Sequence, residues 1–296
     1  TDIKSTHNIY ITSDEHIKMQ DWCYHPLLKW GSVIKSKYDE PNSTMKKIIL
    51  MLLVALTTSL SYSQSCCQLA FASNDGNMSE FTTDKNFVAS HQLPLEYKHN
   101  SLVGGEMITF KTTDVTDGNA YFVKSKTKSK KWLFVYQEWW GLNDHIKKQA
   151  DILYNEMGGN VNVLAIDMYD GKVATTREDA AKYMQGADEK RLENIVNGAL
   201  GYAGKKAKIA SIGWCFGGGW SLKSAILSKK QAVGSVMYYG MPVQDVEKLK
   251  TLNCEVLGLF ATEEWISKKI IEEFAENMKT ANKTLNYKIF EAEHAF

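Results

Sequence analysis

The 296-residue sequence lacks the features that would assign it to several common classes of protein. Lysine and arginine number 35 against 34 acidic residues, so a net charge of +1 offers no basic field, and we expect no nucleic-acid partner. Four prolines are too few for long disordered linkers. There is no C-x-x-C pair and no phosphate-binding G-x-x-x-x-G-K-[ST] motif. The apolar run at 48–56 is too short to span a bilayer, so we expect no stable membrane insertion.

That apolar run has the surroundings of an export signal. Met45 and two lysines precede it, and the small polar stretch 57–65 follows it. A basic start, a short apolar run and small residues before a cut are typical of a secretory signal peptide. The sequence therefore predicts a signal peptide over 45–63 and a periplasmic or extracellular protein, with 1–44 as a non-native upstream segment. A buried core helix at 48–56 is the alternative.

Beyond the signal, residues 64–92 are polar and weakly patterned, which predicts a linker before a domain over 93–296. In that domain, apolar runs typical of buried strands alternate with amphipathic helices. The expected strands are 93–97, 106–112, 120–123, 132–136, 161–166, 207–212, 233–239, 256–260 and 285–290. Such alternation predicts an α/β fold with a mostly parallel central sheet and helices on both faces. Ligands of such sheets bind beyond the carboxyl ends of the strands.

A cysteine stands alone among small residues where one strand should end and a helix begin. The segment reads Gly-Trp-Cys215-Phe-Gly-Gly-Gly, between the strand 207–212 and a helix over 220–228. This is the nucleophile elbow of α/β-hydrolases, with cysteine as the nucleophile. A helix N-terminus also favours the thiolate. The alternative is a glycine-rich turn in which Cys215 packs as a small hydrophobe.

A thiol nucleophile needs a base and a group that orients the base. In α/β-hydrolases the chain order is nucleophile, acid, histidine. His294 is the only histidine after Cys215, and Glu263 and Glu264 follow the strand 256–260. Neighbouring side chains in extended backbone point opposite ways, so one glutamate faces the imidazole. We assign Glu263 to this role and Glu264 to solvent. An ordinary surface or core histidine is the alternative for His294.

A further carboxylate, Glu138, follows the strand 132–136 beside two tryptophans. A carboxylate buried at a strand end is costly unless it has a partner or a chemical role. It either holds or accepts the thiol proton, or is a structural acid that bonds a nearby turn. The backbone N–H groups of Trp139 and Phe216 are the predicted oxyanion hole.

These motifs together resemble the dienelactone hydrolase family. The resemblance rests on Gln137-Glu138 with Gly141, on the Cys215 elbow and on the C-terminal Glu-His294-Ala-Phe, and it spans 93–296. It implies an eight-stranded α/β-hydrolase fold and a cysteine–acid–histidine triad that hydrolyses dienelactones and other small esters. It also implies that Glu138 partners the cysteine, and that no metal or organic cofactor is used.

The resemblance includes one arginine, and the sequence differs from the family pattern in three places. In the family an arginine holds the substrate carboxylate, which matches Arg177; alone, Arg177 reads as an exposed residue at a helix start. Glu263 stands where the family has aspartate. The sequence stops at Phe296, where a second arginine and a last helix would follow, so we expect a C-terminally truncated chain. The pair Trp139-Trp140 is bulkier than usual.

The sequence thus predicts an exported, monomeric hydrolase of a small-molecule ester or lactone. It would act through a Cys215–Glu263–His294 triad and an acyl-enzyme. A non-catalytic exported binding domain of the same fold is one alternative. A thiol-redox role with Cys254 as the resolving partner is another.

Overall fold

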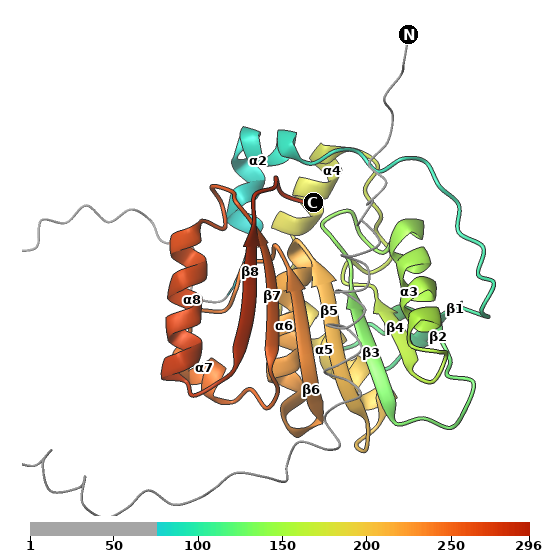
Figure 1. The fold of residues 1–296 in the computed structure, drawn as a ribbon. Coiled ribbons are helices and arrows are strands. Elements are labelled where there is room, and N and C mark those ends of the chain that lie inside the picture. The colour runs from blue at the N-terminus through green and yellow to red at the C-terminus, as the bar shows by residue number, and fades with distance from the viewer. Residues whose placement is uncertain (1–75) are drawn as a thin grey trace, which may run out of the picture. The chain divides into compact units, whose positions relative to one another are not determined.

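The computed structural model describes residues 76–296, so the predicted signal peptide and upstream segment lie outside the described residues. Eight strands form one sheet in the order β1-β2-β4-β3-β5-β6-β7-β8 (Figure 1). The pairs β1–β2 and β2–β4 are antiparallel, and every pair from β4 to β8 is parallel. The predicted α/β-hydrolase fold, with its mostly parallel sheet, is confirmed.

The elements follow the predicted alternation closely. The strands are β1 (Glu106–Phe110), β2 (Gly118–Val123), β3 (Lys131–Tyr136), β4 (Asn162–Ile166), β5 (Lys208–Trp214), β6 (Ala232–Tyr238), β7 (Val256–Ala261) and β8 (Leu285–Phe290). The helices are η3 (Ser79–Thr83), α2 (Lys85–Ser90), α3 (Asp144–Glu156), α4 (Arg177–Gln185), α5 (Glu189–Ala203), α6 (Phe216–Ser228), η4 (Lys229–Gln231), α7 (Val246–Lys250) and α8 (Lys268–Thr280). The expected strand 93–97 is wrong, because that segment has no regular structure.

The central strands are largely apolar because both faces of the sheet are covered. Successive side chains of a strand point to opposite faces. On β3, Phe134 and Tyr136 belong to one hydrophobic cluster and Leu133 and Val135 to the other. Helix α3 packs on the second cluster, whereas α5 and α6 contribute to the first. This two-sided burial holds the carboxyl ends of β3, β5, β7 and β8 in fixed positions around Cys215.

Residues 76–91 correct the expectation of a linker over 64–92. They form η3 and α2, and Phe87 in α2 is fully buried. Asp84 caps α2 by accepting hydrogen bonds from the N–H groups of Asn86 (2.7 Å) and Phe87 (3.2 Å). A six-residue helix is too short to display a periodic pattern and depends on tertiary packing for its stability. The sequence therefore could not show it, and the domain begins earlier than residue 93.

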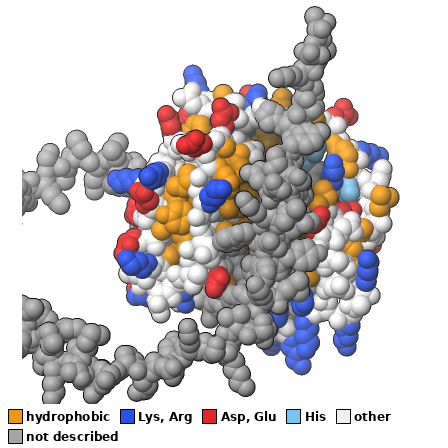
Figure 2. Space-filling view, viewed as in Figure 1, with side chains coloured by type: hydrophobic (Ala, Val, Ile, Leu, Met, Phe, Trp, Pro, Cys, Tyr) orange, Lys and Arg blue, Asp and Glu red, His pale blue; other side chains and the backbone are white. Residues whose placement is uncertain are grey.

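The charges on the face drawn in Figure 2 do not indicate a particular class of partner. Basic and acidic side chains are interspersed on the face drawn in Figure 2, in keeping with the balanced composition. Within residues 76–296, none of the helices is both long and apolar enough to cross a membrane.

Candidate active site

Cys215 occupies the sharp turn between β5 and α6. Its backbone has φ 55° and ψ −122°, a region that side chains other than glycine rarely adopt. Neighbouring glycines make the turn possible. A Cβ on Gly213 would lie 2.1 Å from the carbonyl oxygen of Gly217, and one on Gly217 would lie 2.3 Å from that of Gln137. The expected strand–turn–helix elbow is therefore present, and it holds a thiol that is 1% exposed.

His294 and Glu263 meet as expected from their positions after β8 and β7. Nδ1 of His294 lies 2.6 Å from Oε2 of Glu263, and the two side chains are 1% and 3% exposed. Since a carboxylate can only accept, Nδ1 carries the hydrogen and Nε2 is turned to other groups. Burial acts to lower the pKa of His294, but the Cys215 sulfur and the Glu263 carboxylate outweigh it and raise the pKa to about 10. Glu264 is exposed, as predicted.

A second histidine, which the sequence analysis did not select, contacts the thiol. Nε2 of His91, at the end of α2, lies 3.7 Å from Sγ of Cys215. Its Nδ1 lies 2.7 Å from the carbonyl oxygen of Phe87, which requires the hydrogen on Nδ1 and leaves the lone pair of Nε2 facing the sulfur. Burial, followed by the positive charge of His294, lowers the pKa of His91 to about 3. His91 is thus a neutral imidazole.

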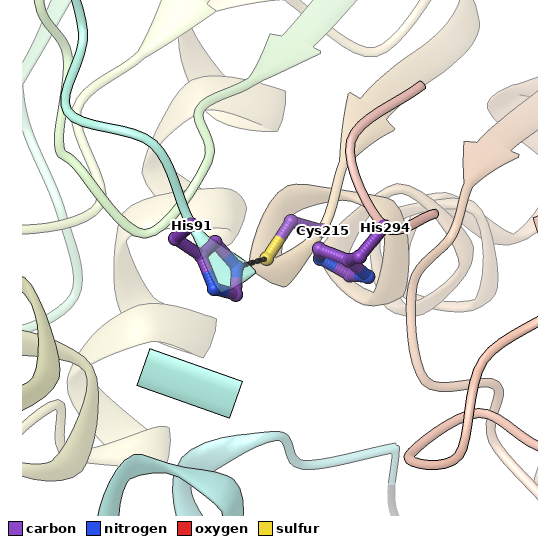
Figure 3. A group of neighbouring side chains, drawn as sticks. All are labelled: His91, Cys215 and His294. Atoms are coloured by element: carbon purple, nitrogen blue, oxygen red, sulfur yellow. Dashed lines mark hydrogen bonds between the residues drawn. The ribbon is translucent and has the colours of Figure 1, made fainter. Parts of the chain in front are cut away.

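Figure 3 shows the sulfur of Cys215 between the two imidazoles. One ligating atom of each of His91, Cys215 and His294 lies within 4.8 Å of the others. Aromatic rings enclose the group: Trp139 is 4.1 Å from the His91 ring, and Tyr239 is 4.9 Å from the His294 ring, between ring centroids. The thiol therefore lies between two imidazoles and is almost completely buried.

Glu138 lies after β3 and is partly buried. Burial raises the pKa of its carboxyl, while the charges of His294 and His145 lower it. The contact that the structure gives to the thiol is with His91, because α2 folds onto the end of the sheet and brings an imidazole to the sulfur. A role of Glu138 toward the thiol proton stays a prediction.

The two predicted oxyanion-hole amides lie on segments that touch each other. Phe216 is the first residue of α6, where backbone N–H groups have no acceptor within the helix. Gly217, the next residue, packs against the backbone at the end of β3, just before Trp139. The Trp139 side chain is fully buried against His91. The two amides therefore lie on neighbouring segments, and their role as an oxyanion hole stays a prediction.

Arg177 lies at the start of α4 and anchors the segment that carries His91. Its Nε donates a hydrogen bond to the carbonyl oxygen of His91 at 2.6 Å. It also lines an open cleft of about 530 Å³ between α4 and the η3–α2 segment. Cys215 is not among the residues that line this cleft. Arg177 therefore holds His91 in place, and its expected contact with a substrate carboxylate stays a prediction.

Several buried polar atoms around the site lack a hydrogen-bond partner within residues 76–296. They are Nε1 of Trp139, Oη of Tyr169, Nε2 of His294, Oε1 of Glu263 and Nε2 of Gln137. Burial, followed by the neighbouring Cys215 sulfur, raises the pKa of Tyr169, so its phenol stays protonated. Unpaired buried polar groups are costly, and their concentration here sets this site apart from the rest of the core.

Comparisons with known proteins agree on one family. The dienelactone hydrolase family matches residues 119–296, more than half of the chain. A protein named "Putative carboxymethylenebutenolidase" from Aquifex aeolicus (strain VF5) is 24% identical over 209 residues, which cover 65% of this chain and 87% of the relative. "Protein usf" from Aquifex pyrophilus is 26% identical over 164 residues, which cover 51% and 68%.

A solved structure has the same fold. The crystal structure of a dienelactone hydrolase-like promiscuous phosphotriesterase from metagenomic libraries is similar with a TM-score of 0.56 and 20% identity. The similarity covers 65% of this chain and 84% of that chain. At this identity the likeness is one of fold.

Proposed function

The chain belongs to the dienelactone hydrolase family, as its sequence motifs predicted, and from this premise we propose that it cleaves a small ester or lactone through an acyl-enzyme on Cys215. That it is a hydrolase acting on ester bonds follows from the family and from the relative named for this activity. The identity of the nucleophile, the triad and the intermediate are the proposal. The observation that carries it is the 2.6 Å contact between Glu263 and a His294 that lies beside the sulfur of Cys215.

In the proposed first step, the Cys215 sulfur attacks the carbonyl carbon of the substrate. The thiol proton passes to Nε2 of His294, which is free because Nδ1 is held by Glu263. The N–H groups of Trp139 and Phe216 stabilise the oxyanion. His294 then gives its proton to the leaving alcohol oxygen, and a thioester remains on Cys215.

In the second step, water attacks the thioester carbonyl and His294 accepts the water proton. The carbon–sulfur bond breaks, the carboxylic acid leaves, and the thiol is restored with the proton from His294. A lactone follows the same steps, except that its alcohol stays in the same product molecule. The carboxylate of Glu263 stabilises the imidazolium that forms in both steps.

The two histidines have different roles in this scheme. His294 is the proton carrier, because the Cys215 sulfur and Glu263 raise its pKa to about 10 and so stabilise the imidazolium that forms when it accepts the thiol proton. His91 is a positioning residue, since its low pKa keeps it neutral and its Nε2 lone pair accepts the S–H hydrogen of the resting thiol.

The test is turnover of p-nitrophenyl acetate and of a panel of small lactones by the full chain. Replacing Cys215→Ala should lower kcat/KM by at least about 10³-fold. The matched control is Cys254→Ala, because Cys254 is the other cysteine in the described part of the chain and is also buried. Equal turnover by Cys215→Ala and the original chain would overturn the proposal. Absence of turnover by the folded original chain on the whole panel would favour the non-catalytic binding domain instead.

We also propose that the protein is exported, on the signal-peptide pattern at 45–63. Intact-mass measurement of the protein from a secreting host should show that residues up to about 63 have been removed. A secreted protein that retains residue 45 would contradict export by this signal.

A further inference from the structure

We propose that His91, Cys215 and His294 form a binding site for one zinc ion, and that zinc bound there arrests the hydrolase. The binding itself is independent of the proposed mechanism, whereas the arrest rests on it.

The donor set and its spacing fit zinc. Imidazole nitrogen and thiolate sulfur are the ligands that zinc prefers in proteins, at about 2.0–2.1 Å and 2.3 Å. Tetrahedral coordination then places the sulfur about 3.6 Å from each nitrogen. Nε2 of His91 is 3.7 Å from Sγ of Cys215, and the three ligating atoms all lie within 4.8 Å of one another. Closing this triangle on an ion requires the side chains to approach by about 1 Å.

Both imidazoles are also oriented as metal ligands are. Zinc-binding histidines almost always donate the other ring N–H to a carboxylate or a backbone carbonyl, which fixes the tautomer and the ring plane. Nδ1 of His91 donates to the carbonyl of Phe87 at 2.7 Å, and Nδ1 of His294 donates to the Glu263 carboxylate at 2.6 Å. Each Nε2 is therefore directed toward the sulfur from a ring that cannot easily turn.

An independent observation points to a missing partner at this place. Nε2 of His294 is buried and has no hydrogen-bond partner within residues 76–296. His294 as a whole is 7% exposed, so bulk water does not supply one. A metal ion would satisfy this nitrogen, the His91 lone pair and the sulfur together.

The composition of the group selects the kind of ion. It contains two nitrogens and one sulfur and no carboxylate oxygen. Hard ions such as Mg²⁺ and Ca²⁺ prefer oxygen ligands, whereas imidazole and thiolate favour zinc and its softer neighbours. Three protein ligands leave the fourth tetrahedral position to a water molecule.

Binding and catalysis exclude each other in this arrangement. Zinc forms a bond to the Cys215 sulfur and releases the thiol proton to solvent, with no change of oxidation state. The sulfur lone pair that would attack a carbonyl is then shared with the metal. Nε2 of His294 also binds the metal, so it cannot carry the proton between thiol and leaving group. Esterase activity should fall in step with occupancy.

The direct test uses Co²⁺ as a spectroscopic probe of the chelator-treated full chain. We expect one equivalent to produce a thiolate-to-cobalt charge-transfer absorption in the near ultraviolet, and Zn²⁺ to abolish it by displacement. Cys215→Ser should lose the band, and His91→Ala should weaken Co²⁺ affinity at least about tenfold. Cys254→Ser and His145→Ala are the matched controls, and each should retain the charge-transfer band and the Co²⁺ affinity of the original chain. Circular dichroism of each variant verifies that it is folded.

The outcomes separate the metal site from the esterase. A charge-transfer band that persists in folded Cys215→Ser, or unchanged affinity in folded His91→Ala, would overturn the site. If the band behaves as expected while the original chain hydrolyses none of the esters, the proposed function fails and the metal site stands. If the band behaves as expected and the esterase keeps full activity at saturating Zn²⁺, the arrest is overturned.

Discussion

Glu263 and His294 come from the loops after two neighbouring parallel strands, and their Oε2 and Nδ1 atoms lie 2.6 Å apart with both side chains almost sealed from solvent. In a buried setting such a charge-assisted contact is strong, and it fixes the ring with Nε2 free. Glutamate, one methylene longer than the aspartate of the resembled family, therefore still reaches the histidine. The loop after β7 accommodates the extra length.

Removal of the charge on Glu263 tests its role. Glu263→Gln keeps the shape of the side chain but cannot stabilise an imidazolium, so kcat/KM for an aryl ester should fall by roughly 10²- to 10⁴-fold. The pKa of His294 should fall as well, which NMR titration of the ring detects. Glu264→Gln is the matched control and should stay within about twofold, because Glu264 is exposed. Equal losses in the two variants would contradict the assignment.

His91 should make the fold sensitive to acid. Its pKa of about 3 in the folded chain lies below the ordinary value of 6.5, so the folded state binds fewer protons than the unfolded state between these pH values. Stability therefore falls as pH decreases through this window. His91→Gln should reduce the slope of the unfolding free energy against pH by up to about 1.4 kcal/mol per pH unit. Urea denaturation at a series of pH values measures it, and an unchanged slope in the variant would contradict a buried neutral His91.

Phe87 should anchor the segment that carries His91. Its ring contacts those of His91, Trp139 and His294 and is fully buried. Phe87→Ala should lower the free energy of unfolding by about 3 kcal/mol through the cavity it leaves. Leu95→Ala, at a position that is 71% exposed, should change it by less than about 0.5 kcal/mol. Similar values for the two variants would show that α2 is not part of the core.

The elbow should tolerate no side chain at Gly217. A Cβ there would lie 2.3 Å from the backbone oxygen of Gln137, so Gly217→Ala must displace the end of β3 or the start of α6. We expect a loss of more than about 2 kcal/mol in stability and most of the esterase activity. Gly201→Ala is the opposite control. Gly201 lies in α5 with open space around it, and alanine should stabilise the helix by about 0.5–1 kcal/mol. Chemical denaturation of both variants measures whether Gly217→Ala lowers the free energy of unfolding and Gly201→Ala raises it.

Much of the sheet could be predicted because burial on two faces leaves a plain signal. All five residues of β4 are buried and the last four are apolar, and such an apolar run is typical of a central parallel strand. The elbow and the downstream acid and histidine could be predicted because chain order is fixed by the fold. The alternation of side chains in extended backbone predicted that only one of Glu263 and Glu264 faces the imidazole, and the structure shows that it is Glu263.

His91 could not be predicted, since nothing local in the sequence links it to Cys215, 124 positions away. The contact exists only because a six-residue helix packs onto the finished sheet. One signal was available: Phe87 lies four residues before His91, the spacing of two side chains on one helical face. Because α2 packs against the site, the imidazole of His91 contacts the sulfur, a contact that the sequence analysis did not include.

The most direct measurement of the central claim is the site of the acyl group during turnover. The full chain and a His294→Gln variant are mixed with p-nitrophenyl acetate, quenched in acid and digested, and the peptides are weighed. We predict one acetyl group on the peptide that contains Cys215 of the original chain, and much less in His294→Gln, because His294 accepts the thiol proton in the first step and activates water in the second. Turnover without acetyl on Cys215, or with the acyl group on another residue, would contradict nucleophilic catalysis by this cysteine.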